Sequence, residues 1–126
     1  MPLGKTSLAK LKGVNPDLVR VIKRAGEESK IDFMVVEGLR TMERQKQLKK
    51  AGATTILNSR HITGHAVDVV PLIDGKPRWD WPLYRKLAPY IWAAAKAEKV
   101  PLEWGGDWKK FPDAPHWQLP RKKPYL

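Results

Sequence analysis

The run Ala-Val-Asp-Val-Val at 66–70 constrains the fold of this chain more than any other segment. Its small and β-branched residues favour a strand, and we expect Pro71 to end that strand. Because side chains alternate along a strand, Asp68 shares one face with the residues two positions away, while Val67 and Val69 lie on the other. The sequence therefore predicts a largely apolar strand that carries one acid.

Helix caps, hydrophobic periodicity and turn residues predict the elements around this strand. The expected elements are a helix from Asn15 onward, a strand at 32–37, a polar helix at about 41–50, a helix from Asp80 to about Lys99, and short strands at 102–104 and 116–119. Pro89 is expected to kink or divide the helix that contains it. This order predicts an α+β fold in which helices pack on a small, mainly antiparallel sheet.

The length and the absence of cysteine limit both architecture and chemistry. A chain of 126 residues with 42% hydrophobic residues fits one domain, and we expect 1–126 to fold as a single domain. Because the chain has no cysteine, disulfides, thiolate metal clusters and cysteine nucleophiles are excluded. Any metal must then bind through histidine and carboxylate.

The charge balance points to an anionic partner. The chain has 24 Lys and Arg against 13 Asp and Glu, a net charge of +11, which suits nucleic acid, lipid headgroups or an acidic wall polymer. The basic run 121–123 is expected to be a solvated tail. We see no apolar N-terminal run of the kind a signal peptide needs, and no segment long enough to cross a bilayer. We therefore expect synthesis in the cytoplasm and no membrane insertion.

Two histidine–aspartate pairs indicate a metal site. His61 lies seven positions before Asp68 across a turn that contains Gly64, and Asp113 lies three positions before His116. Two imidazoles and one carboxylate form a catalytic zinc site that leaves a fourth position for water. We predict His61, Asp68 and His116 as the ligands of one Zn²⁺ ion.

Other residues keep two interpretations open. His61 and His65 would form a metal pair if their segment were helical, but Gly64 and the strand that follows argue against this, and His65 is expected to face solvent. Asp107 either orients a ligand histidine from outside the metal shell or forms an ion pair with a nearby lysine. Of the six tryptophans, we expect Trp92 and Trp117 in the core, and Trp104 or Trp108 along a substrate groove.

Three segments resemble, in the same order, the motifs of the VanY-like D-alanyl-D-alanine carboxypeptidase family of zinc peptidases. Residues 59–68 resemble its Ser-x-His-x-x-Gly-x-Ala-x-Asp signature, and Glu-Gly-Leu-Arg-Thr at 37–41 with Gln45 resembles its upstream element. Its second motif is matched by Trp-Gly-Gly-Asp-Trp at 104–108 and Asp-Ala-Pro-His-Trp-Gln at 113–118. This short basic chain most resembles the phage endolysins of the group, which cut the L-alanyl-D-glutamate bond of peptidoglycan stems.

The resemblance implies a fold of the hedgehog/D-Ala-D-Ala peptidase type, with 1–126 as a single catalytic domain and no separate cell-wall-binding domain. It also implies roles for four further residues. Asp113 matches the general base, and Arg40 matches the arginine that steadies the substrate carbonyl and the oxyanion. Ser59 and Gln45 occupy positions expected to bind substrate. The implied partners are peptidoglycan as substrate and a holin for release to the wall, with the chain acting as a monomer.

Three alternatives remain open at this point. A D,D-carboxypeptidase that trims a terminal D-alanine would use the same residues. A small basic nucleic-acid-binding protein would explain the charge, but it would leave the histidine–aspartate pairs unexplained. A zinc-bearing fold used only for binding would not need Asp113 and Arg40.

Overall fold

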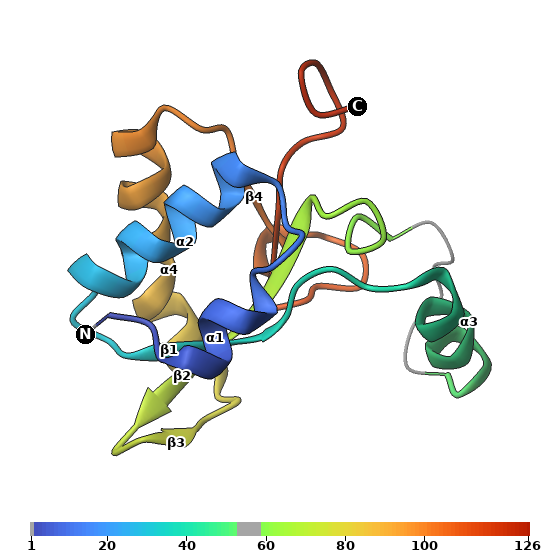
Figure 1. Ribbon diagram of the computed structural model, residues 1–126. Helices are drawn as coiled ribbons and strands as arrows, with labels where there is room; N and C mark the ends of the chain where they lie inside the picture. Colours follow the sequence, from blue (N-terminus) through green and yellow to red (C-terminus); the bar gives the residue numbers. More distant parts are fainter. Residues whose placement is uncertain (1, 53–58) are drawn as a thin grey trace.

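The computed structural model describes residues 2–52 and 59–126 (Figure 1). The elements along the chain are α1 (Lys5–Lys10), α2 (Pro16–Glu28), β1 (Phe33–Glu37), α3 (Met42–Lys50), β2 (Ala66–Ile73), β3 (Lys76–Pro77), α4 (Trp81–Glu98), β4 (Glu103–Trp104), the 3₁₀ helix η1 (Gly105–Asp107) and β5 (His116–Gln118). The expected elements are all present, and α1 and β3 were not predicted from the sequence.

The sheet is antiparallel and has β2 near its centre. Its order is β1-β2-β5-β4, and β3 forms a hairpin with the far end of β2. This confirms the α+β fold with a small antiparallel sheet. The prediction that Pro71 ends the strand is wrong, since β2 continues to Ile73. Pro71 is tolerated because its carbonyl accepts the Arg78 N–H at 2.9 Å and the ladder resumes where Leu72 N–H donates to Asp32 O at 2.7 Å.

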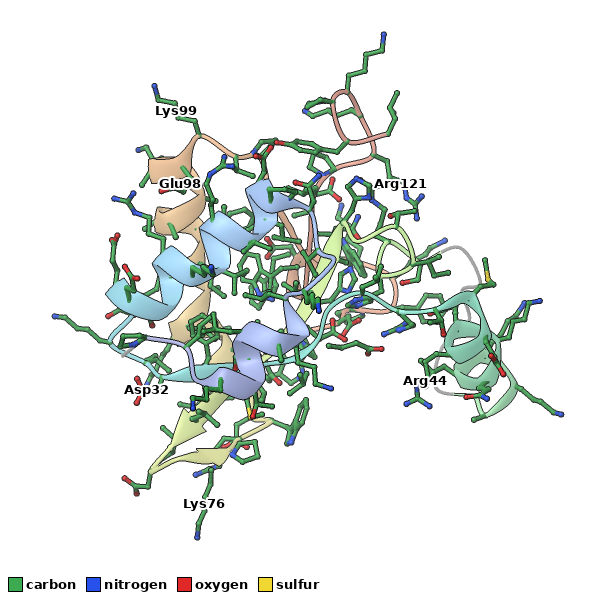
Figure 2. All side chains as sticks on the ribbon, in the orientation of Figure 1. Asp32, Arg44, Lys76, Glu98, Lys99 and Arg121 are labelled. Carbon is green, nitrogen blue, oxygen red and sulfur yellow. The ribbon has the colours of Figure 1, made fainter. Side chains whose placement is uncertain are left out.

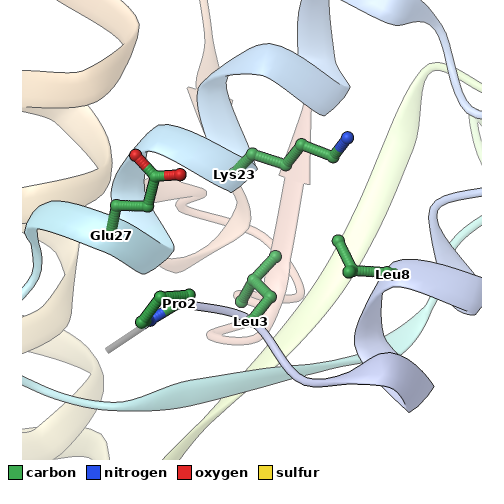
Figure 3. A pocket seen from close by; sticks show the side chains of 5 residues that line it. All are labelled: Pro2, Leu3, Leu8, Lys23 and Glu27. Carbon is green, nitrogen blue, oxygen red and sulfur yellow. The ribbon is translucent and has the colours of Figure 1, made fainter.

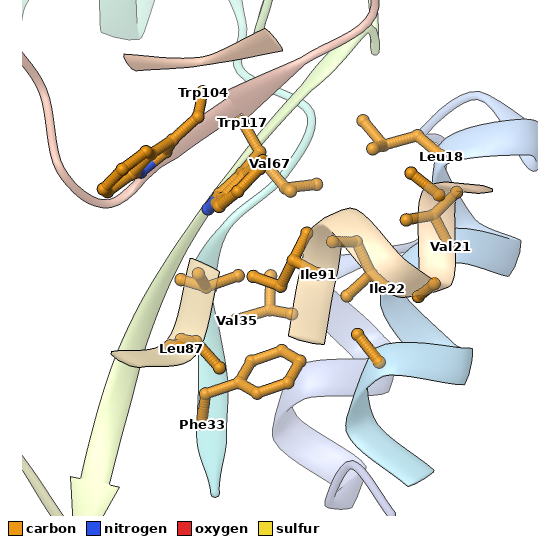
Figure 4. Close-up of a cluster of buried hydrophobic side chains, with 14 of the residues drawn as sticks. Leu18, Val21, Ile22, Phe33, Val35, Val67, Leu87, Ile91, Trp104 and Trp117 are labelled. Atoms are coloured by element: carbon orange, nitrogen blue, oxygen red, sulfur yellow. The ribbon is translucent and has the colours of Figure 1, made fainter. Parts of the chain in front are cut away.

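The two faces of the sheet have different environments. Residues paired across strands point to the same face, so the pairs Val67–Trp117 and Val35–Val69 share one face. Helices α2 and α4 pack against each other beside this face, where Figure 4 shows the buried cluster. The pair Asp68–His116 therefore lies on the opposite face. One layer of strands separates the apolar core from the chemistry-bearing residues.

Both core helices begin where their caps predict. In α2 the Asn15 side chain accepts a hydrogen bond from Asp17 N–H at 2.9 Å, and Pro16 occupies the first turn. In α4 the N-cap is Asp80, and the helix runs unbroken through Pro89 to Glu98. The helix is not divided, because Pro89 lies on the exposed face together with Arg85, whose carbonyl loses its helical partner on the solvent side.

The tryptophans are distributed differently from the prediction. Trp117 is 1% exposed, as expected for a core residue, but Trp92 is 36% exposed, although the two rings pack edge to face with centroids 5.1 Å apart. Trp104 is buried, stacks on Trp117 at 5.5 Å between centroids, and donates its indole N–H to Ala114 O at 2.7 Å. Trp104 is therefore a core residue and does not line a groove.

Exposed basic side chains are spread along the chain, for example Arg44, Lys76 and Lys99 (Figure 2). The basic run 121–123 is exposed as expected, but the chain after it returns to the body of the protein. Tyr125 is buried, and its hydroxyl donates to Asp17 Oδ2 at 2.6 Å. Within the described ranges, no helix has the length and apolar character needed to cross a membrane.

A pocket of about 240 Å³ lies between the N-terminal segment and α2. Figure 3 shows the side chains that line it, which are Pro2, Leu3, Leu8, Lys23 and Glu27. This lining has no histidine and a single carboxylate, so it does not provide the donor set of a metal site.

Candidate metal centre and active site

The strands bring the three predicted ligands together on the open face of the sheet. Asp68 of β2 and His116 of β5 are register partners, and His61 reaches them from the turn that precedes β2. Asp68 Oδ1 lies 3.1 Å from His61 Nε2 and 3.2 Å from His116 Nδ1. One donor atom from each residue fits within 4.8 Å of the others. This is the donor set of a three-ligand metal site.

The turn before β2 decides which histidine joins this group. Gly64 has φ +76, a left-handed conformation that breaks any helix through the segment, and a Cβ there would lie 2.8 Å from the carbonyl oxygen of Gly13. His65 therefore does not pair with His61. Its Nδ1 lies 2.6 Å from Thr63 Oγ1, and the residue is half-buried rather than fully solvent-facing.

The electrostatics of the group favour an ionised carboxylate. Burial opposes the charge of Asp68, but its hydrogen bonds with His116 and His61 outweigh burial and hold the pKa of Asp68 well below its usual range. Burial likewise acts to lower the pKa of His116, and the contact with Asp68 outweighs it, so that pKa is raised. The centre is therefore an ionised carboxylate flanked by two imidazoles, a set of donors suited to a divalent cation.

The outer nitrogen of each imidazole has an acceptor. His61 Nδ1 lies 2.9 Å from Gly38 O, and His116 Nε2 lies 2.8 Å from Gln118 Oε1. Such contacts orient histidine ligands and leave the inner nitrogens free to bind metal, so these residues fit a metal ion. We expected Asp107 as one candidate for this role, but it is exposed, and among the described residues its side chain forms no hydrogen bond or ion pair with either ring or with a lysine. Gln118 occupies the position instead.

Asp113 approaches the centre on the loop between η1 and β5. Its N–H donates to Gly105 O at 2.8 Å, and its carbonyl accepts His116 N–H at 3.2 Å, so one turn carries both residues. Burial raises the pKa of Asp113, and the negative charge of Asp68 adds to this effect. A carboxyl whose pKa is raised beside a metal site has a higher proton affinity than an exposed aspartate, which favours a role as general base.

Arg40 is held at the end of β1 by two side chains. Its Nε and Nη2 donate to the two oxygens of Glu37, each at 2.6 Å, and Nη1 donates to Gln45 Oε1. A β-bulge between Val35 and Glu37 makes Glu37 the partner of Asp68, which places it on the site face. Arg40 Nη2 consequently lies 3.9 Å from Asp68 Oδ2.

The two predicted substrate-binding residues make internal contacts. Gln45 is fully buried and accepts from Arg40, and the half-buried Ser59 accepts the His61 N–H at 3.1 Å. Trp108, one of the two groove candidates, is half-buried, with its ring centroid 5.1 Å from that of His116.

Sequence reasoning overlooked Glu37 and Gln118, although both lie inside the recognised motifs. The period of two along a strand puts Gln118 on the face of His116, and this signal was available in the sequence. The bulge that directs Glu37 to the site had no comparable signal.

Comparison with solved structures finds the same fold. The L-Ala D-Glu endopeptidase ChiX of Serratia marcescens is 46% identical, with a TM-score of 0.87 over 92% of this chain and 87% of ChiX. The vancomycin-resistance D,D-dipeptidase VanXYg is 16% identical, with a TM-score of 0.55 over 84% of this chain and half of that protein. The latter likeness concerns the fold alone.

Sequence comparison agrees with this result. The L-alanyl-D-glutamate peptidase of Escherichia phage T5 is 36% identical over 115 residues, which cover 87% of this chain and 83% of that protein. The family model described as phage L-alanyl-D-glutamate peptidase matches residues 1–119. The chain therefore belongs to the family of phage L-alanyl-D-glutamate peptidases.

Proposed function

We propose that this protein is a zinc-dependent endopeptidase that hydrolyses the L-alanyl-D-glutamate bond of peptidoglycan stems and so lyses the bacterial host. The observation that carries the proposal is the meeting of His61, Asp68 and His116 on one face of the sheet, with Asp113 on the adjoining turn. Family membership supports the choice of substrate and bond.

The chain offers three donors to a zinc ion, namely His61 Nε2, His116 Nδ1 and a carboxylate oxygen of Asp68. When bound, zinc supplies a Lewis acid for the scissile carbonyl and for the attacking water. The low pKa of Asp68 supports this role, because the carboxylate is already ionised and no proton must be displaced from it.

Asp113 is proposed to take the proton of the attacking water and to deliver it to the departing amine nitrogen. Burial and the charge of Asp68 raise its pKa, so this carboxyl holds a proton more tightly than an exposed aspartate does, which favours its taking the proton from water before the proton passes to the amine. The turn that joins Asp113 to His116 fixes the base relative to a metal ligand.

Arg40 is proposed to stabilise the oxyanion as a fixed positive charge. Its guanidinium is 9% exposed, and Glu37 and Gln45 hold three of its nitrogens in place. A preorganised charge in a site with little water stabilises a developing anion without the cost of reorientation. On these contacts we propose Gln45 as a positioning residue for Arg40, and Ser59 as a residue that shapes the turn before His61.

The delivery of the enzyme follows from its likeness to phage endolysins. We propose synthesis in the host cytoplasm and access to the wall through a holin that permeabilises the membrane. A monomer suffices for the reaction, because one chain supplies all three candidate ligands.

Digestion of purified peptidoglycan tests the proposed bond and the metal together. We expect new glutamyl amino termini, which disappear after treatment with a chelator and return when zinc is added. Release of free D-alanine without new glutamyl termini would instead identify a D,D-carboxypeptidase.

The variant His116→Ala tests the ligand set. It is expected to lose both zinc and activity, with Gln47→Ala on the exposed face of α3 as the control. Full zinc occupancy of His116→Ala by elemental analysis would show that the ligand set is wrong.

A further inference from the structure

A chain of side-chain hydrogen bonds leads from the metal centre to the edge of the sheet. His116 Nε2 lies 2.8 Å from Gln118 Oε1, and Gln118 Nε2 donates to Glu103 Oε1 at 3.0 Å. Glu103 of β4 and Gln118 of β5 are register partners. His116 and Gln118 are buried, whereas Glu103 is exposed. The series therefore begins at the surface and ends at a candidate ligand.

The polarity of this series has one consistent direction. An ionised carboxylate only accepts hydrogen bonds, so the amide NH₂ of Gln118 must face Glu103. The carbonyl oxygen of Gln118 then faces His116 and requires a proton on Nε2. With Nε2 protonated, Nδ1 is the nitrogen left for a metal ion. Without metal, Nδ1 donates to the ionised Asp68, whose Oδ1 lies 3.2 Å away, and a metal ion displaces that proton when it binds.

We propose that Gln118 and Glu103 are positioning residues that select the Nε2–H tautomer of His116, so that this histidine binds metal through Nδ1. The inference rests on the metal site of the proposed function and assigns two residues that act on it from outside. Neither residue touches the metal position.

The contrast with His61 explains why two residues are needed. The outer nitrogen of His61 faces the backbone carbonyl of Gly38, a group that can only accept. A glutamine amide has two nearly isosteric orientations, and the wrong one places NH₂ against the histidine ring. Glu103 removes this ambiguity because only one orientation satisfies both neighbours.

The position of Glu103 predicts a graded effect. Glu103 and Gln118 line a surface pocket of about 320 Å³ together with Pro120, Arg121 and Lys122. Water in this pocket can accept the hydrogen bond that the Gln118 amide donates to Glu103, but it cannot replace the buried hydrogen bond between Gln118 and His116. A change at Glu103 is therefore expected to weaken zinc binding less than a change at Gln118.

The test measures zinc affinity by competition with a chromogenic chelator. Loss of an outer hydrogen bond to a metal-bound histidine typically costs 10- to 100-fold in affinity, so Gln118→Leu is expected to bind zinc about 10- to 100-fold more weakly. Gln118→Glu keeps an acceptor for Nε2 but sets a second carboxylate against Glu103, so it is combined with Glu103→Gln, which restores a donor between the two side chains. This double variant is expected to retain about the original affinity. Glu103→Gln alone should fall between Gln118→Leu and the double variant.

The exposed residues Gln47 and Glu27 provide matched controls. Gln47→Leu and Glu27→Gln are expected to bind zinc within about twofold of the original protein. A second measurement, ¹⁵N NMR of the histidine rings in the zinc-loaded protein, should show a protonated Nε2 and a metal-bound Nδ1 for His116. Circular dichroism identifies any variant that fails to fold, and the double variant keeps the comparison decisive if Gln118→Leu is one of them.

Two results would overturn the inference while leaving the proposed function intact. One is an unchanged zinc affinity in folded Gln118→Leu, and the other is an NMR spectrum with the metal on Nε2 of His116. If the original protein binds no zinc at all, the proposed function fails first and the inference fails with it.

Discussion

The substitution Gly105→Ala tests whether close packing of η1 against the Asp113 turn places the catalytic groups. A Cβ on Gly105 would lie 2.4 Å from the carbonyl oxygen of Asp113, and 3.1 Å from the Cβ atoms of both Asp113 and His116. Real Cβ atoms essentially never lie within 3.0 Å of another heavy atom, so the Asp113 turn must move away by at least 0.6 Å. The obstacle is steric, since the backbone of Gly105 is not left-handed.

The expected magnitude follows from this displacement. Overpacking of a close-packed contact costs about 1–3 kcal/mol, and we expect the free energy of unfolding of the metal-free protein to fall by that amount. The turn that moves carries both the proposed base and a proposed metal ligand. A misplacement of about 1 Å costs about 10²-fold in rate, so kcat/KM should fall by about 10- to 100-fold.

The assay combines urea unfolding of the metal-free protein with hydrolysis of purified peptidoglycan at saturating zinc. Gly4→Ala is the matched control, because a Cβ at Gly4 meets nothing within 4 Å. Its only expected effect is a loss of up to about 1 kcal/mol from the N-cap of α1. Unchanged stability together with unchanged kcat/KM in Gly105→Ala would refute the idea that this contact positions Asp113.

Three further outcomes follow from the charges of the site. Asp113→Asn should keep zinc but lose about 10²-fold or more in kcat. In the original protein, kcat/KM should fall as the pH drops through the raised pKa of Asp113. If the Asn variant shows the same fall of kcat/KM at low pH, Asp113 is not the general base. Because the pKa of Asp68 is lowered, the metal-free protein should lose stability as the pH falls below about 4, the ordinary range of an aspartate. Urea unfolding of Asp68→Asn should show a weaker dependence, which does not vanish because the pKa values of Asp17 and Glu98 are lowered as well; an unchanged dependence would contradict the role of Asp68. Glu37→Gln replaces the carboxylate that accepts from two nitrogens of Arg40 by a neutral amide with one acceptor oxygen, and should cost about 1.5–3 kcal/mol of stability and lower kcat, with zinc affinity unchanged. A variant that loses zinc in proportion to activity would show instead that Glu37 supports the metal site.

Most of the secondary structure could be predicted because its signals are local. Asn15 and Asp80 begin their helices as N-caps, and Gly64 breaks the segment between the two candidate histidines. Local rules were insufficient where a neighbour in space changed the outcome. Pro71 continues its strand because Arg78 and Asp32 complete the hydrogen bonds around it.

The candidate site divides in the same way. The types of metal-binding side chain and their spacing can be read from the sequence, which is enough to select His61, Asp68 and His116 as candidate ligands. The residues that orient them were harder to find. The role of Gln118 depends on the direction in which its amide points, and the role of Glu37 depends on a bulge that changes the register between β1 and β2. Neither can be derived from the sequence.

The amino-acid sequence by itself determined most of the helices and strands, the absence of thiol chemistry and the identity of the candidate ligands, because caps, periodicity and residue types act over a few positions. Only the tertiary structure decided which side chains support those ligands, that Trp104 rather than Trp92 is buried, and how closely Gly105 meets Asp113. The physical reason is that register, side-chain burial and hydrogen-bond direction depend on atoms brought together from distant parts of the chain.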